Sequence, residues 1–462
     1  MIRLTTFFKV YKFHILLVLA CVLFYLSFAY NLKRSDVPKL ITLYSALFFL
    51  FFQLIKMLKH NIQLLTWVAF GFRAVFLLAI PNLSQDFYRF IWDGRLILEG
   101  INPYLHPVEH YMQMGSFPIA QAQELYNGMG KLNASHFSNY PPINQLLFTL
   151  AALLGGKTIL GPVIVMRLAI IAADFGTLYF GKKILEKLKL PIHHIFFYIL
   201  NPFIIIELTG NLHFEGVMIF LLVWSLYLLF QKKWKLAALT LGLSISVKLI
   251  PLLFLPLFYQ WFTKHPVWKY WTGLKKLLFF YGIVFAIIVC TFLPFYFSGL
   301  TSVYIDTIGL WFKRFEFNGS LYYLAREIGY TISGYNQIAT IGKGIVVLVL
   351  IFVLALTFLR RNKSIPQLIT AMLLALSFYY FTATTVHPWY ISTLLVLCMF
   401  TNYKFPLVWS FVAILSYLAY NNTNNTENFW ILGLEYVIVY GVFIWEVFIK
   451  KATKKGGLNF IS

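Results

Sequence analysis

Long apolar stretches separated by short polar segments run along most of the chain. Runs of this length cross a bilayer as helices, whereas the strands of a membrane β-barrel would be shorter and would alternate apolar with polar residues. The short run 143–155 predicts a partial or re-entrant helix, and about 12–14 transmembrane helices are expected in total. The clear runs lie near 14–31, 40–57, 62–80, 162–181, 192–207, 214–230, 277–297, 342–359, 366–383, 387–401, 405–420 and 430–449.

The segment 236–260 is also long and apolar, but Lys248 and Pro251 interrupt it. This pattern fits either one tilted helix or two short helices that form a hairpin. Hydropathy alone leaves both alternatives open.

Composition agrees with an all-α polytopic membrane protein. Of the 462 residues, 60% are hydrophobic and 12% are charged, about half the charged fraction of a soluble domain. The mean hydropathy is +0.75. We expect one membrane-embedded domain over 1–462, without a cleavable signal peptide. Cys21, Cys290 and Cys398 stand in apolar runs, so they are expected to be small core residues and not a disulfide framework or a metal site.

The net charge of +22 comes largely from lysine and arginine in short loops, such as those at 182–189 and 360–363. Basic loops are typical of the cytoplasmic face of a membrane protein, so we predict no nucleic-acid partner, cytoplasmic termini and contacts with anionic membrane lipids. One loop departs from this rule. It contains Lys33, Arg34 and Lys39, yet it falls on the outer side.

Two long segments, 81–142 and 298–341, face outward in this topology. Each is too long to serve only as a connection, and both are rich in aromatic residues with interspersed polar residues and Pro or Gly. The chain carries no soluble domain of ordinary size. The chemistry is therefore expected at the outer face of the membrane.

Charge is concentrated near the start of the first long segment. In a helix that begins at Asp86, the side chains of Asp86, Arg89 and Asp93 share one face, so Arg89 would stand between two carboxylates. A carboxylate beside an arginine stays ionised, which suits a general base that accepts a proton from a sugar hydroxyl. The alternative is an ion-pair cluster on an interfacial helix that Phe87, Tyr88 and Trp92 anchor in the membrane.

Glycine and proline indicate where the neighbouring helices end and begin. Gly100 is expected to cap the helix that starts at Asp86, and Pro103 to prevent its continuation. Pro142 is expected to open the helix that returns to the membrane. Tyr140, which precedes it, is a candidate sugar contact.

Polar side chains also gather at the outer end of a predicted helix pair. Polar residues at membrane depth are costly and usually mark a site, although a polar turn exposed to water is the alternative. We predict that these residues contact the sugar or the acceptor. They are Glu207, Asn211, His213 and Glu215.

Three further candidates stand apart from these clusters. Lys248 is either an anchor that reaches the membrane surface or a cation that holds a lipid phosphate. His387 precedes Trp389 and Tyr390, which are expected in the aromatic belt of the membrane interface, and it is either a helix cap or a donor to a phosphate. Asn318 in the second long segment is a candidate contact for sugar hydroxyls.

Asp174 lies in the middle of a predicted helix, where an ion pair with Arg167 or Lys248 is expected. The chain contains no phosphate-binding glycine loop, no dinucleotide-binding motif and no Cys/His spacing for a metal. No nucleotide-sugar domain, metal site or other cofactor is therefore predicted.

The order of the motifs carries a family resemblance. The stretches "DFYRFIWDGRLILEGINPY", "YPP", "NPFIIIELTGNLHFEG", "LGLSISVKLIPLLFLP", "FEFNGSLYYL" and "HPWY" follow one another between about 80 and 400. In this order they resemble the bacterial GT-C glycosyltransferases, and most of all the mannosyltransferases that use polyprenyl-phosphate mannose.

The resemblance implies an enzyme of the bacterial inner membrane whose site faces the periplasm. An aspartate in the first outer loop of such enzymes is the base, and by position it is Asp86, with Asp93 as its orienting or pairing partner. The family generally inverts the anomeric carbon, so a β-linked donor gives an α product, and its dependence on metals varies. Phosphate contacts would fall to Arg89, Arg95, Lys248 or His387.

The function expected from these observations is a hexosyl transfer. One sugar, mannose by resemblance, would pass from a polyprenyl-phosphate donor to a lipid or glycan acceptor. A flippase or other transporter of lipid-linked saccharides is an alternative, but it predicts polar residues along a path to both faces. A polymerase or ligase that transfers a whole glycan shares the outer-face chemistry and stays open.

Overall fold

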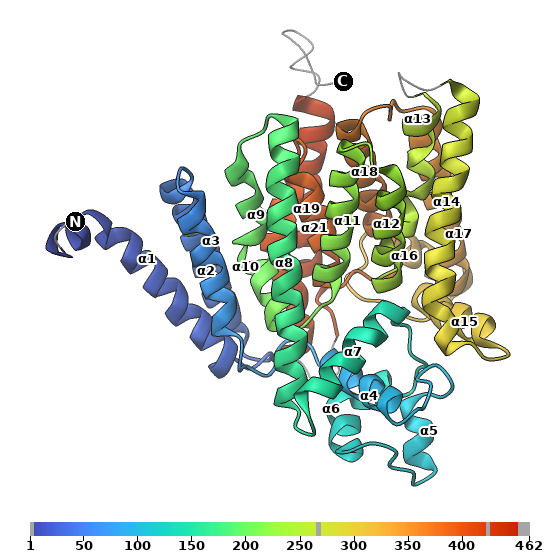
Figure 1. Cartoon of the computed structure of the whole chain (residues 1–462). Helices are drawn as coiled ribbons and strands as arrows, with labels where there is room; N and C mark the ends of the chain where they lie inside the picture. The colour runs from blue at the N-terminus through green and yellow to red at the C-terminus, as the bar shows by residue number, and fades with distance from the viewer. Residues whose placement is uncertain (1–3, 265–268, 422–425, 451–462) are drawn as a thin grey trace.

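The computed structural model describes residues 4–264, 269–421 and 426–450, and these residues form a bundle of helices (Figure 1). Within them, the single β pairing is an isolated bridge between Phe317 and Thr385. Seven described helices are long and apolar enough to cross a membrane, or eight if the bent segment 192–210 counts as one span. The prediction of an all-α polytopic membrane protein is confirmed.

The long helices coincide with predicted apolar runs. The bent segment turns by 46° where Asn201 and Pro202 interrupt it. Buried apolar side chains form one continuous core between the helices. The long helices are α1 (Leu4–Asn31), α2 (Val37–Leu58), α8 (Leu160–Leu188), α14 (Tyr270–Phe292), α17 (Ile338–Phe358), α18 (Ile365–Thr382) and α21 (Phe429–Ile444), and the bent segment comprises η1 (Ile192–Ile195), α9 (Phe196–Ile199), α10 (Pro202–Ile204) and η2 (Ile205–Gly210).

Most other predicted crossings coincide with shorter helices. These are α3 (Ile62–Val75), α7 (Pro142–Gly155), α11 (Glu215–Phe230), α12 (Trp234–Val247), η3 (Ile250–Leu257) with α13 (Phe258–Thr263), η5 (Pro388–Tyr390) with α19 (Ile391–Cys398), and α20 (Phe405–Val412) with η6 (Ala413–Asn421). The remaining elements are α4 (Asp86–Leu98), α5 (Val108–Gln113), α6 (Ala122–Ala134), η4 (Leu293–Phe295), α15 (Leu300–Lys313), α16 (Leu321–Ser333) and η7 (Trp445–Ile449).

The predicted crossing 62–80 is wrong at its outer end, because α3 stops at Val75. The reason is a buried guanidinium on α8. Arg167 donates hydrogen bonds to the carbonyl oxygens of Leu77 and Gly210, each at 3.0 Å. A buried charge requires acceptors, and the residues beyond a helix end offer free carbonyls. Apolarity therefore continues past Val75, but the helix does not.

The segment 236–260 is the hairpin and not the tilted helix. Lys248 has an extended backbone, with φ −147° and ψ 138°, so it separates α12 from η3 and α13. The rings of Trp234 at the start of α12 and Phe262 in α13 lie 6.0 Å apart, which shows that the two arms run antiparallel. Lys248 thus stands at the tip of a membrane hairpin.

Helices α4 to α7 form a layer at one end of the bundle (Figure 1). Helix α4 crosses α7 closely, since a Cβ atom on Gly94 would lie 2.2 Å from the carbonyl oxygen of Phe148. The predicted boundaries here are confirmed. Gly100 follows α4 with φ +73°, and Pro142 is the first residue of α7.

Candidate functional site

A polar cavity of about 540 Å³ lies where the layer α4–α7 meets the bundle. It is bordered by the start of α4, the chain before α7, the hairpin tip and the loops around 316 and 387. Segments far apart in the sequence therefore converge on one space. Five of the predicted site residues line it: Asp86, Arg89, Tyr140, Lys248 and His387.

Asp86 is the first residue of α4 and one of the two acidic residues that line this cavity, with Glu316 as the other. Its carboxyl accepts a hydrogen bond from Asn133 Nδ2 at 3.5 Å. Burial raises the pKa of Asp86 to about 6, although the charges of Lys248 and Arg34 act in the opposite direction. A carboxylate with a pKa close to neutral is a better proton acceptor than an ordinary aspartate.

Asp93 has a different environment. It is completely buried, and Arg89 Nε donates to its Oδ1 at 2.8 Å. Ser138 Oγ and Gln145 Nε2 donate to Oδ2 at 2.6 and 3.0 Å. The expectation that Arg89 stands between two carboxylates is therefore wrong. Arg89 pairs with Asp93, and of the two aspartates only Asp86 lines the cavity.

The interfacial-helix alternative for α4 loses two of its three anchors, because Phe87 and Trp92 are buried, whereas Tyr88 is half-buried. Arg95 lies outside the cavity lining. It donates to the carbonyl oxygens of Ala120 and Thr158 at 2.6 and 3.0 Å. In this structure Arg95 connects α4 to the loops that contain Ala120 and Thr158.

Arg89 organises the cavity wall as well as pairing with Asp93. Its Nη1 donates to the carbonyl oxygens of Asn133 and His136 at 3.1 and 3.0 Å. The same turn presents Asn133 to Asp86. The ion pair and these two bonds therefore fix a neighbour of the proposed base.

Lys248 forms an ion pair with Glu215, with Nζ 2.9 Å from Oε1. Glu215 is completely buried, whereas the Lys248 side chain is 22% exposed and borders the cavity. Its ammonium also lies 5.7 Å from the ring centroid of Tyr140. Glu215, a predicted sugar contact, thus stands behind the cation and outside the cavity lining.

An aromatic stack forms another wall. The ring of Trp389 lies between His213 and His387, with centroid distances of 3.7 and 4.5 Å. Trp389 and Tyr390, which the sequence placed in the interface belt, line the cavity. Burial lowers the pKa of His387 to about 3, which keeps this ring neutral.

Behind this stack, Glu207 is buried, with 1% of its surface exposed. Tyr417 donates its hydroxyl to Glu207 at 2.9 Å, and His213 Nε2 lies 3.8 Å from the same carboxyl. Asn211 accepts a hydrogen bond from the backbone N–H of Leu83 at 3.1 Å. Glu207, Asn211 and His213 therefore support the cavity wall, and none of the three lines the cavity.

The second outer segment is tied to the loop that carries His387. Phe317 donates its backbone N–H to Thr384 and accepts one from Val386, at 3.1 and 2.8 Å. Asn318 is buried beyond this junction. Its side chain donates to Glu435 at 3.2 Å, so it does not face the cavity.

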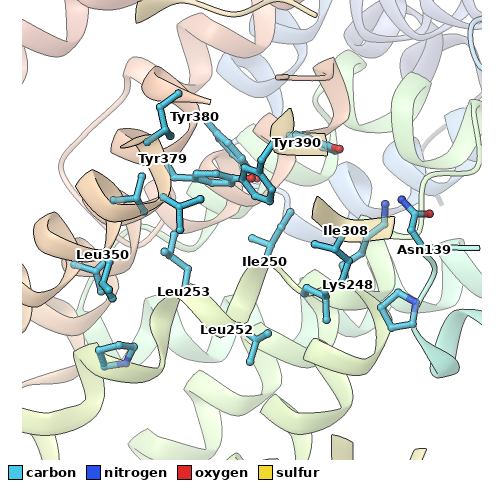
Figure 2. Close-up of a pocket in the computed structure, with 18 of the residues that line it drawn as sticks. Asn139, Lys248, Ile250, Leu252, Leu253, Ile308, Leu350, Tyr379, Tyr380 and Tyr390 are labelled. Carbon is cyan, nitrogen blue, oxygen red and sulfur yellow. The ribbon is translucent and has the colours of Figure 1, made fainter. Parts of the chain in front are cut away.

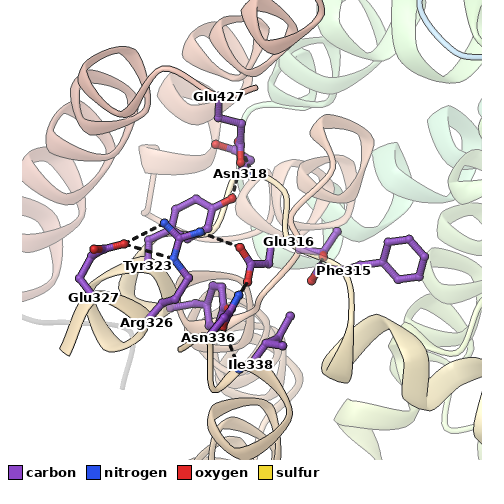
Figure 3. Close-up of polar contacts among 11 residues, drawn as sticks. Phe315, Glu316, Asn318, Tyr323, Arg326, Glu327, Asn336, Ile338 and Glu427 are labelled. Carbon is purple, nitrogen blue, oxygen red and sulfur yellow. Dashed lines mark hydrogen bonds and ion pairs between the residues drawn. The ribbon is translucent and has the colours of Figure 1, made fainter. Parts of the chain in front are cut away.

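Glu316 reaches the cavity from the same segment. Figure 3 shows Arg326 between Glu316 and Glu327, and Arg326 Nη1 donates to Glu316 at 2.7 Å. Asn336 and Tyr322 also donate to Glu316. The carboxylate is thus held by three donors, which fixes the loop before Phe317.

Several residues at the cavity were not predicted as site residues. The sequence signal at Arg34 is its basic loop, which departs from the positive-inside rule. For the aromatic residues, the sequence offers no signal other than their abundance, because long-range packing brings them to the cavity. These additional lining residues include Arg34, Glu316, Trp389, Tyr390, Tyr417 and Tyr420.

Two other expectations concern buried charges and metals. Asp174 pairs with neither Arg167 nor Lys248, because Arg73 Nε donates to it at 2.8 Å. The described part of the chain contains no group of three or more His, Cys, Asp or Glu residues arranged to hold a metal ion.

The fold and the cavity define the class: an integral membrane protein with a polar, acid-bearing site at one end of its bundle. Residues 15–264, more than half of the chain, match the MptA/B family, described as alpha-(1->6)-mannopyranosyltransferase, N-terminal domain. The chain belongs to this family and is a membrane mannosyltransferase, with a sugar donor and a glycan acceptor as substrates. No curated protein matches the chain.

Proposed function

We propose that this mannosyltransferase is a GT-C enzyme that transfers one mannose from a polyprenyl-phosphate carrier to a lipid or glycan acceptor. One observation carries the proposal. The polar cavity with Asp86 shares Lys248, Asn139, Tyr140 and Tyr390 with an apolar pocket. A lipid-phosphate sugar has the same order of parts as these two spaces, because its apolar chain is followed by a charged phosphate and then by a polar sugar.

The apolar pocket has a volume of about 460 Å³ and is formed by η3, α15, α17 and α18. Figure 2 shows Lys248 and Asn139 at one end of it and Leu350 at the other. Isoprene units of the carrier would lie between these ends, because the transfer of apolar surface from a polar to an apolar environment lowers the free energy. The carrier phosphate would then meet the ammonium of Lys248, which binds phosphate as a point charge.

The proposed reaction is a direct displacement. The acceptor hydroxyl oxygen forms a bond to the anomeric carbon of mannose, and the bond from that carbon to the phosphate oxygen breaks. Asp86 takes the hydroxyl proton, and the electron pair leaves with polyprenyl phosphate, whose charge Lys248 stabilises. A single displacement inverts the carbon, so a β-linked donor yields the α linkage that the family description names.

Basic loops support an outward-facing site. Basic residues gather at the end of α8 (182–189), where α11 meets α12 (232–235), and between α17 and α18 (360–363). The opposite ends of α11 and α12 carry the ion pair of Glu215 and Lys248 beside the cavity, so the 232–235 stretch lies away from it. In Figure 1 the layer α4–α7 is at the bottom and the end of α21 at the top. By the positive-inside rule the basic end is cytoplasmic, which leaves the cavity on the periplasmic side of a bacterial inner membrane.

The test is transfer by the purified full chain in detergent. Polyprenyl-phosphate [³H]mannose is offered as donor, GDP-mannose as the control donor, and product mass is recorded. Transfer of one hexose from the lipid donor alone supports the proposal. Transfer from GDP-mannose, or of a preassembled glycan, would refute it, and transport into vesicles without transfer would favour a flippase.

A further inference from the structure

Four cationic side chains line the polar cavity, and the proposed reaction uses only Lys248 among them. Arg34 stands in the turn between α1 and α2 and borders the cavity, but not the apolar pocket. It is thus separate from the junction at which Lys248 is placed.

The turn is fixed to the segment that leads into the proposed base. Asn82 Nδ2 donates to the carbonyl oxygens of Phe28 and Leu32 at 2.7 and 3.2 Å. Arg34 Nη1 donates to the carbonyl oxygen of Leu83 at 3.2 Å. Asp86 begins α4 three residues further on. The position of Arg34 is therefore set relative to Asp86.

The guanidinium of Arg34 lies on the ring of Tyr420, 3.9 Å from its centroid. A stacked guanidinium keeps its hydrogen-bond donors in the plane of the group and available at its edge. Its bond to Leu83 uses one of five N–H donors. Within the described residues, no carboxylate lies within ion-pair distance of Arg34.

Of the other cations that line the cavity, Lys131 is an exposed side chain, and the remaining two are paired. Arg89 is paired with Asp93, and Lys248 is paired with Glu215. Arg34 consequently combines a full charge, free donors and a polar cavity in front of it. The planar fork of a guanidinium matches the oxygens of a phosphate or carboxylate group.

We propose that Arg34 is a second anion-binding position of the cavity, which holds a phosphate or carboxylate group of a substrate by paired hydrogen bonds. The proposal rests on the proposed function for the identity of the substrates. It also explains why a basic loop stands on the outer side. Its arginine would bind an anion in the site and would not set the orientation of the chain in the membrane.

The first experiment measures anion binding without turnover. Inorganic phosphate is titrated at constant ionic strength against the full chain in non-ionic detergent, with stabilisation against heat as the signal. We expect Arg34→Gln to weaken phosphate binding about tenfold and Arg34→Lys to weaken it less. Lys33→Gln, an exposed neighbour in the same turn, is the matched control and should bind as the wild type does.

The second experiment identifies which substrate supplies the anion. Transfer from polyprenyl-phosphate mannose is measured with a neutral and with a phosphate-bearing glycolipid acceptor. A raised donor KM with both acceptors assigns the donor phosphate, and a raised KM for the charged acceptor alone assigns the acceptor. Both results support the anion site.

Unchanged phosphate binding in a folded Arg34→Gln protein would overturn the inference, whatever the turnover. Glutamine can still donate to Leu83, and Arg34→Lys keeps the charge, so the two variants separate anion binding from damage to the turn. If the wild type binds phosphate but transfers no mannose from the lipid donor, the proposed function fails while the anion site is still tested.

Discussion

Replacing Asp86 by asparagine should abolish transfer and stabilise the fold at the same time. Burial raises the pKa of Asp86 from 3.8 to about 6. A rise of roughly two units corresponds to about 3 kcal/mol, which is the free energy by which ionisation disfavours the folded state at pH 8. Asparagine keeps the shape of the side chain without the charge, so Asp86→Asn should recover most of this energy.

The sign follows from linkage. The folded pKa lies above the unfolded value, so ionisation of Asp86 lowers stability as the pH rises through the two values. The gain of Asp86→Asn over wild type should be about 3 kcal/mol at pH 8 and shrink to about 1 kcal/mol at pH 4.5. Wild-type kcat/KM should rise with pH up to about 6 and then level off, because the base must be ionised.

The assay combines turnover with heat unfolding of the detergent-solubilised chain at both pH values and one heating rate. We expect transfer by Asp86→Asn to fall by about 10²–10⁴-fold, with a higher unfolding temperature at pH 8. Asp93→Asn is the control, since it removes the partner of buried Arg89 and should lose about 3–5 kcal/mol at both pH values.

Two results would refute this reasoning. Turnover of Asp86→Asn within about threefold of the wild type would show that the residue is not the base. An unfolding temperature at pH 8 that does not exceed the wild-type value would show that Asp86 carries no burial penalty.

Three further predictions concern the surroundings of the site. Glu215→Gln should release Lys248 from its fixed position and raise the donor KM about tenfold. The same variant should move the acid limb of the kcat/KM profile to lower pH, because the charge of Glu215 raises the pKa of Asp86. An unmoved profile would contradict this reasoning. Tyr417→Phe should cost about 1–3 kcal/mol, seen in the unfolding temperature, since a buried carboxyl loses its donor. Gly94→Ala should lower the yield of folded protein more than Gly100→Ala, because only the former forces α4 away from α7.

Much of the local structure was predictable because short-range rules decide it. The helix end at Gly100 and the helix start at Pro142 follow from φ restrictions that act within one or two residues. The break at Lys248 was visible as an interruption, but the choice between a tilted helix and a hairpin was not. That choice depends on whether the two arms pack on each other, as Trp234 and Phe262 do.

The candidate site was predictable only as a set of residue types. Asp86 and Asp93 are seven residues apart on one helix, and their charge pattern makes them equivalent. Tertiary structure separates them, because Ser138 and Gln145 reach Asp93 from another segment and leave Asp86 at the cavity. Hydrogen-bond partners that arrive from distant segments leave no trace in the local pattern.

The sequence by itself determined the solvent in which this protein folds, the approximate position of its helices and the end of the bundle where polar chemistry gathers. Hydropathy and charge decide these properties residue by residue. Tertiary structure decided which charges are paired and which face the cavity. Arg89, Arg95 and Lys248 look alike along the chain. Packing decides which of them only holds other segments and which also borders the cavity, through the carbonyls and carboxylates that it places around each charge.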